Sequence, residues 1–192
     1  APVASVRELP LDLREEVGRI GVAPHHPLAV LGVGTSTSPA AAARLRTFDV
    51  VIAAAGRPVA RFIDLQEALA RNQGTLVPVT YLRPASVSGA LGGLVDLDTY
   101  EPRLATLTPE SGAGDALARA GIEIADLYVS QVSVGSPEHR IGLLPGDRLL
   151  ELDGKPIAMW ATFMEDLRNG RGKPHVLRWR RGDQEKTGRF AL

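Results

Sequence analysis

The 192-residue chain contains no cysteine, which excludes disulfide bonds, a thiolate nucleophile and zinc ligation by cysteine. Aromatic residues make up only 5% of it, so aliphatic side chains must fill most of any core. Neither sign of charge is in excess, because 22 Lys and Arg residues balance 22 Asp and Glu residues. This balance argues against a nucleic-acid-binding protein, which normally carries a basic excess, and we expect no nucleic-acid partner.

Long hydrophobic runs are also lacking. No window reaches the roughly 18 consecutive apolar residues of a membrane span, and no charged segment followed by an apolar one opens the chain as a signal peptide would. The chain begins at Ala1, and we expect it to be an excised or processed soluble piece of a larger protein. Its apolar content of 44% is sufficient for a packed core, and its length suits one or two domains.

An internal repeat is the strongest signal in the sequence. Identical residues recur at an offset of 98 positions, from Ser38 and Ser136 as far as Arg83 and Arg181. Upstream the offset changes to 100, since Ile20-Gly21-Val22 corresponds to Ala120-Gly121-Ile122. The natural boundary between the copies lies near Asp98 to Gly114, where the run 108–114 is rich in turn-forming residues. We therefore predict a first domain at 1–105, including its N-terminal segment, and a second domain at 106–192.

Each copy shows the pattern of a mostly β fold with short helices, of the α+β class. In the second copy, Ser136-Pro137 is a good helix start, because serine caps the helix and proline suits its first position. The strand at 149–152 ends at Asp153-Gly154, a strong signal for a tight hairpin turn. A longer helix is expected around 160–167, and alternating residues at 176–180 indicate a further strand.

The run from Ser136-Pro137 to Gly146-Asp147, followed by an apolar strand and Gly154-Lys155-Pro156-Ile157, resembles the bacterial form of the PDZ domain. The first copy departs from this pattern at Arg44, Thr47 and Phe48, where Gly, Pro and Gly would be expected. The resemblance implies two PDZ-like domains in tandem, of the bacterial, circularly permuted type. It also implies no catalytic group in the chain itself.

PDZ domains bind an extended peptide, usually a C-terminus, by strand addition beside a helix. By resemblance, a glycine between apolar residues would form each carboxylate loop, the following strand would be the edge strand, and a helix would supply an apolar wall. The peptide-binding residues so implied are Ile20, Gly21, Val22, Phe62, Gln66 and Leu69 for the first copy, and Ala120, Gly121, Ile122, Ile124, Trp160, Met164 and Leu167 for the second.

Catalytic and metal-binding patterns are missing from the chain. The four histidines do not have the spacing of the His-Glu-x-x-His zinc motif, and no Gly-x-Ser-x-Gly elbow is present. Arg178, Arg180 and Arg181 surround Trp179, and strand alternation makes a solvated strand face the simplest interpretation of them. We expect no cofactor and no metal in this fragment.

The second copy, with Pro156 to Phe163 followed by Leu167-Arg168-Asn169, resembles the second PDZ domain of RseP-type site-2 intramembrane zinc metalloproteases. This resemblance implies a periplasmic domain pair of an inner-membrane protein whose zinc lies in the membrane part. The pair would gate access of substrates, such as anti-sigma factors, by size exclusion or by binding their C-termini. Its partners would be the substrate polypeptide and the rest of the protease. The alternative is a peptide-binding PDZ pair of an HtrA-like serine protease or a secretion-system scaffold.

Overall fold

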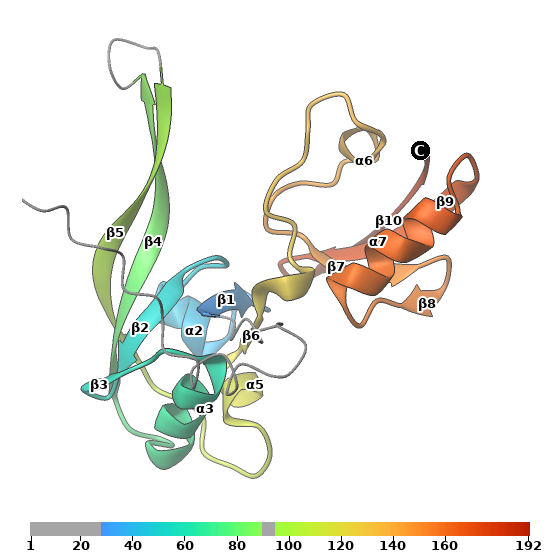
Figure 1. The fold of residues 1–192 in the computed structure, drawn as a ribbon. Helices are drawn as coiled ribbons and strands as arrows, with labels where there is room; N and C mark the ends of the chain where they lie inside the picture. The colour runs from blue at the N-terminus through green and yellow to red at the C-terminus, as the bar shows by residue number, and fades with distance from the viewer. Residues whose placement is uncertain (1–27, 90–94) are drawn as a thin grey trace, which may run out of the picture.

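The computed structural model describes residues 28–89 and 95–192, and these form two antiparallel sheets with a few short helices. The prediction of a mostly β fold with short helices is confirmed. The first sheet has the strand order β5-β4-β2-β1-β6, with β3 paired to β2, and the second has the order β10-β9-β7-β8. Figure 1 shows the two sheets side by side, with the ribbon of β4 and β5 extending away from the first.

The first sheet is formed by β1 (Ala29–Val33), β2 (Val50–Ala54), β3 (Arg57–Pro58), β4 (Val77–Gly89), β5 (Val95–Leu107) and β6 (Ile122–Ile124), with helices α2 (Pro39–Ala42), α3 (Phe62–Arg71) and α5 (Ala116–Ala120). We call these elements the first unit.

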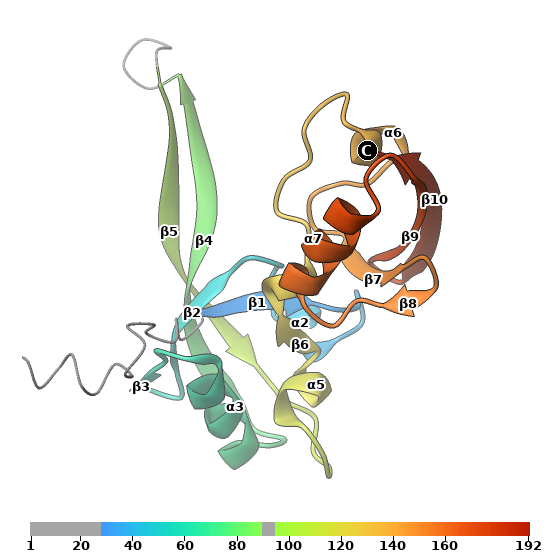
Figure 2. The ribbon, with the colours of Figure 1, turned by 45° about the vertical axis from the view of Figure 1, so that its right-hand side comes forward.

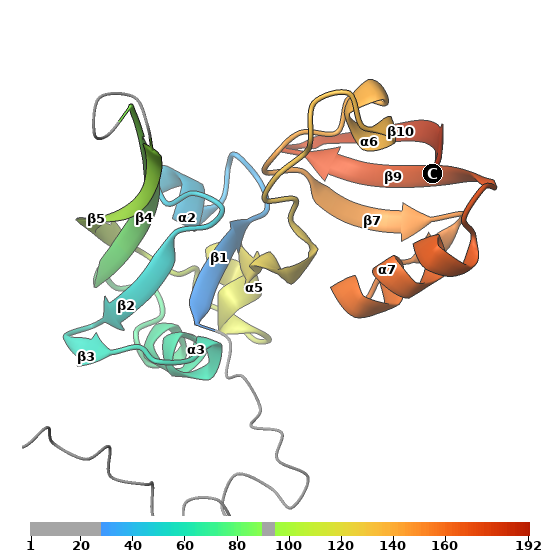
Figure 3. The same ribbon diagram turned by 45° about the horizontal axis from the view of Figure 1, so that its top comes forward.

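The second sheet is formed by β7 (Arg148–Leu152), β8 (Lys155–Pro156), β9 (Pro174–Arg181) and β10 (Gln184–Ala191), with helices α6 (Pro137–Arg140) and α7 (Trp160–Asn169). These elements and the segment from Tyr128 to α6 are the second unit. The short 3₁₀ helix η1 (Ala125–Leu127) joins the two units (Figure 3).

The sequence repeat corresponds to repeated structure. Ser38 caps α2 by accepting from the Ala41 amide, and Ser136 caps α6 by accepting from the His139 amide. The pairing of β2 with β4 shifts register between Val51 and Ala53, and that of β7 with β9 shifts 98 residues later. Even this local irregularity is therefore preserved between the copies.

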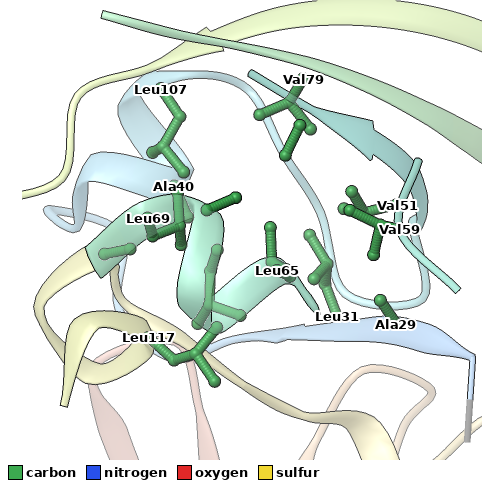
Figure 4. Close-up of a cluster of buried hydrophobic side chains, with 14 of the residues drawn as sticks. Ala29, Leu31, Ala40, Val51, Val59, Leu65, Leu69, Val79, Leu107 and Leu117 are labelled. Carbon is green, nitrogen blue, oxygen red and sulfur yellow. The ribbon is translucent and has the colours of Figure 1, made fainter. Parts of the chain in front are cut away.

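Each unit has its own core. In the first, α3 packs its buried face, which includes Leu65 and Leu69, against β1, β2 and β4, as Figure 4 shows. In the second, Trp179 of β9 is 1% exposed and lies among Leu149, Phe163 and Leu177. Because the two clusters are separate, each unit buries its apolar surface independently.

Two features were not anticipated. The region around Asp98, expected near the domain boundary, belongs to β5, which pairs with β4 from Val77 opposite Leu107 to Val87 opposite Leu97. In addition, α5 and β6 follow the predicted boundary at 105/106 and yet pack on the first unit, where β6 pairs with β1. The domain boundary itself stays a prediction.

Candidate functional site

Within the described part of the chain, one side of β6 is a free strand edge. Strand β6 is the last strand of the first sheet, with β1 on its other side. On β1, the Leu31 amide donates to Asp49 O at 2.8 Å, so the Leu31 backbone faces β2. The Gly34 amide donates to Gly121 O at 3.3 Å on the opposite side. Antiparallel strands alternate in this way, so the backbone of Glu123 faces β1 while the amides of Ile122 and Ile124 point away from it. Within 28–89 and 95–192, no strand pairs with this second side.

Gly121 makes the turn that brings β6 onto the sheet. It ends α5 with φ of +72°, a conformation that favours glycine, and a Cβ here would lie 2.1 Å from Ser38 Cβ. Its amide donates to Ala118 O at 2.9 Å. The glycine is therefore needed for a tight helix-to-strand turn, and its amide is already used within that turn.

Helix α3 lies beside α5 and β6 (Figure 2). Their side chains line a groove of about 740 Å³. Phe62, Ile63 and Gln66 line it from α3, and Ile63 is 45% exposed. The Gln66 side-chain amide donates to Asp115 Oδ1 at 3.1 Å, while the same carboxylate caps α5 by accepting from the Leu117 amide at 3.0 Å. An open strand edge, an apolar helix wall and a polar end thus meet in one groove.

The structure brings some of the predicted peptide-binding residues together and separates others. Those that line the groove come from both predicted sites: Phe62, Gln66, Gly121, Ile122 and Ile124. Leu69 and Ala120 are each 0% exposed and belong to the core of the first unit. The remaining first-copy residues, Ile20, Gly21 and Val22, lie outside the described residues.

The expected grouping of Gly121 with the helix of Trp160 is not what the structure has. Because β6 pairs with β1 and not with the second sheet, Gly121 lies beside α3. On α7, Leu167 is a core residue and Met164 packs partly against that core. Trp160 is 40% exposed and lines a separate apolar hollow of about 550 Å³ with Phe48, Tyr128 and Ile124, among others.

Three charged groups at the groove were missed by reasoning from sequence. Glu123 accepts from Arg180 at 2.9 Å and from the Nε of Arg148, and both arginines belong to the second unit. Arg148 and Arg180 are opposite each other in the pairing of β7 with β9. The interpretation of Arg180 as part of a solvated strand face overlooked this contact, and no short spacing could reveal it, since Glu123 is 57 residues away from Arg180.

The same cluster affects the ionisation of Tyr128. Burial raises the pKa of the Tyr128 phenol, and the nearby Glu123 carboxylate acts in the same direction. Burial would lower the pKa of Arg180, but its hydrogen bond to Glu123 raises that pKa overall. Tyr128 is therefore neutral and Arg180 charged across the physiological pH range.

The described residues do not fit a metal centre. Across 28–89 and 95–192, no cluster of three or more His, Asp or Glu side chains could hold an ion. His175 is 5% exposed, with Nδ1 2.7 Å from Asp153 Oδ2 and Nε2 3.1 Å from Gly170 O. These contacts use both ring nitrogens to join a helix end to a hairpin, which is a structural role.

Among the helices of the described part of the chain, none has the length and apolar character needed to cross a membrane.

Comparison with known proteins gives local similarity only. No family model matches the chain. A protein of Neisseria meningitidis serogroup A that is named as a zinc metalloprotease is 45% identical over 56 residues, which are 29% of this chain and 13% of that protein. The regulator of sigma-E protease RseP of Salmonella typhimurium is 37% identical over 49 residues, which are 26% of this chain and 11% of the protease. The chain thus matches only about an eighth of these relatives, and over this short region it is related to RseP-type zinc metalloproteases.

Proposed function

We propose that this chain is a non-catalytic tandem PDZ region of an RseP-like site-2 membrane metalloprotease, and that it recognises an extended segment of a substrate polypeptide. The observation that carries the proposal is the open edge of β6 lying beside α3 across the groove. The local similarity to RseP-type proteases supports the choice of parent.

Strand addition is the chemistry that this arrangement suits. An incoming strand would bond to the outward amides of Ile122 and Ile124, and those main-chain bonds would provide affinity for many sequences. Side chains of the incoming strand would alternate between the two faces of the sheet. Those directed toward α3 would meet Phe62, Ile63 and Gln66, which gives a preference for apolar residues.

In the parent protein, which we place in the inner membrane with these domains in the periplasm, binding of this kind would gate proteolysis. A substrate such as an anti-sigma factor would reach the zinc centre in the membrane part only when a suitable extended segment, such as one near its new C-terminus, is exposed. Steric exclusion of bulky substrates by the two units is the second mechanism of the same proposal, and it does not require the groove to bind.

The groove is tested by titrating the ¹⁵N-labelled chain with an apolar extended peptide and following amide chemical shifts. We expect the largest changes in β6 and α3. The variant Ile124→Pro removes one outward amide, and the native φ of −71° already suits proline. It should weaken binding about five-fold, as expected for one lost hydrogen bond.

Ile124→Val is the matched control, because it keeps the amide and a branched side chain, and it should bind like the unmodified chain. Equal weakening by both variants would contradict strand addition. If no amide shifts at millimolar peptide, groove binding is wrong and only the steric mechanism is left.

A further inference from the structure

We propose that the groove selects an extended segment with an acidic side chain between two apolar ones, and that Arg148 and Arg180 of the second unit bind this acidic side chain. The inference rests on the proposed strand addition to β6, and it names the class of segment that is bound. It concerns two arginines that line the groove from outside the first unit.

The alternation of β6 sets the pattern. Ile122 is 2% exposed and belongs to the core of the first unit, which α3 shares. Glu123 points to the other face, where it meets Arg148 and Arg180. Residues directly opposite one another on neighbouring strands share a face of the sheet. The ligand residue opposite Glu123 therefore lies at the arginine pair, and its two neighbours face α3.

The charge of the cluster formed by Arg148, Arg180 and Glu123 determines which ligand residue is favoured opposite Glu123. Two guanidinium groups meet one carboxylate in this cluster, so a positive charge is left over. The Arg148 and Arg180 side chains are 28% and 23% exposed, so their charges are less screened than those of fully exposed residues. Each guanidinium has five N–H donors. Arg148 donates to Glu123 from Nε, and Arg180 donates from Nη2 to Glu123 and Tyr128, so each side chain has further donors for a ligand. A ligand carboxylate is attracted here, and a ligand ammonium is repelled.

The other end of the groove does not offer an alternative anchor for a carboxylate. The Gly121 amide is bonded to Ala118 O at 2.9 Å. The Asp115 carboxylate lines the groove beside Gln66 and would repel a second carboxylate. The anionic group that the groove recognises is therefore a side chain along the segment and not a free C-terminus.

The test uses three acetylated and amidated eight-residue peptides of alternating Val and Ser that differ only at one central position, which is Glu, Gln or Lys. We expect the Glu peptide to bind about five-fold more tightly than the Gln peptide, the ratio that corresponds to about 1 kcal/mol for one ion pair. The Lys peptide should bind most weakly, and the differences should shrink as salt is added.

Substitutions at the arginine pair and at Glu123 should change the affinity for the Glu peptide in opposite directions. Arg148→Gln should abolish the preference for Glu over Gln. Glu123→Gln should strengthen binding of the Glu peptide, because it removes the competing carboxylate but keeps a side-chain oxygen that can still accept from Arg148 and Arg180. Arg189→Gln, the same change on β10 at a residue that does not line the groove, should leave all three affinities unchanged.

The outcomes separate this inference from the function on which it rests. Equal binding of the three peptides, with shifts in β6, would overturn the acidic preference and leave strand addition intact. Tighter binding of the Lys peptide would also overturn it. Failure of every peptide to shift β6 would instead reject strand addition itself. Binding of a peptide only when its C-terminus is free would show that a terminal carboxylate, and not a side chain, is recognised.

Discussion

At the scale of single residues, the repeat conserves one buried ion pair in each unit. Asp49 and Asp147 are each 1% exposed. Arg83 bonds both oxygens of Asp49 at 2.8 and 2.7 Å, and Arg181 bonds both oxygens of Asp147 at 2.7 Å. A bidentate contact of this kind fixes the geometry as well as the charge. In the first unit the pair connects the turn before β2 to β4, and in the second unit it connects the turn before β7 to β9.

Removing the arginine should leave the buried Asp147 carboxylate without its charged partner, while the Leu144 amide still donates to it at 2.8 Å. We expect Arg181→Ala to lower the free energy of unfolding of the second unit by about 3 kcal/mol. Arg178→Ala on the same strand is the control. The two arginine side chains are similarly exposed, at 37% and 40%, but the carboxylates that Arg178 pairs with, Glu151 and Glu185, are 28% and 57% exposed, whereas Asp147 is 1% exposed. It should cost less than about 1 kcal/mol.

Urea unfolding followed by tryptophan fluorescence measures both variants in the same unit, because Trp160 and the buried Trp179, the two tryptophans of the chain, both belong to the second unit. Equal losses in Arg181→Ala and Arg178→Ala would show that burial of Asp147 does not determine the energy of the pair.

At the scale of elements, the positions of helices and turns within the repeat could be predicted from the sequence. The helix of Trp160 lies in the expected range, although no side chain caps it at Met159. The helix starts at Ser38 and Ser136 and the hairpin at Asp153-Gly154 lie where the local residues place them. Capping and turn chemistry act within a few residues, so sequence is enough for them.

Two elements could not be predicted in this way. The β4–β5 ribbon continues past Arg83, where the repeat ends, so the second copy provides no template for the length of the ribbon. The sequence also does not determine which strand β6 pairs with. The connection at 108–115 could bring β6 to an edge of either sheet, and the apolar residues around Gly121 would suit both. The strand and the helix that line the groove were therefore assigned to two different predicted sites, and the structure brings them together.

The turn between α5 and β6 should be sensitive to a single methyl group. Ala at position 121 would adopt a left-handed conformation at a cost of about 1–2 kcal/mol, and its Cβ would collide with Ser38. Gly56→Ala is the control, since φ is +74° there and nothing lies within 4 Å of the added Cβ.

We expect Gly121→Ala to increase the hydrogen exchange of β1 amides more than Gly56→Ala does, because β6 would separate from β1. If the two substitutions have the same effect on β1, then backbone strain alone explains the loss and the contact with Ser38 has no influence.

At the scale of the whole molecule, the two units are joined through polar contacts and one aromatic ring. Glu123 contacts Arg148 and Arg180, and Ser36 donates to Asp183. The ring of Tyr128 covers Gly32 so closely that a Cβ there would lie 2.2 Å from it. Contacts of this kind orient two separate cores without merging them.

The arginine contacts should therefore set how rigidly the units are held. We expect Glu123→Ala to loosen them, so that residual dipolar couplings, which fit one alignment tensor in the unmodified chain, require two tensors of different magnitude. Glu185→Ala, which breaks an exposed pair inside the second unit, should keep a single tensor. A single tensor in Glu123→Ala as well would assign the orientation to Tyr128, η1 and the contact of Ser36 with Asp183.

The return of β6 to the first sheet has a practical consequence for anyone who wishes to produce the halves as separate polypeptides. A first fragment that ends at position 105 would lack β6, which pairs with β1. The amides and carbonyls of β1 that bond to β6 would then form an exposed strand edge, and exposed strand edges promote self-association. A cut just after Ile124 would leave that neighbour in place, so solubility of the two N-terminal products should differ sharply.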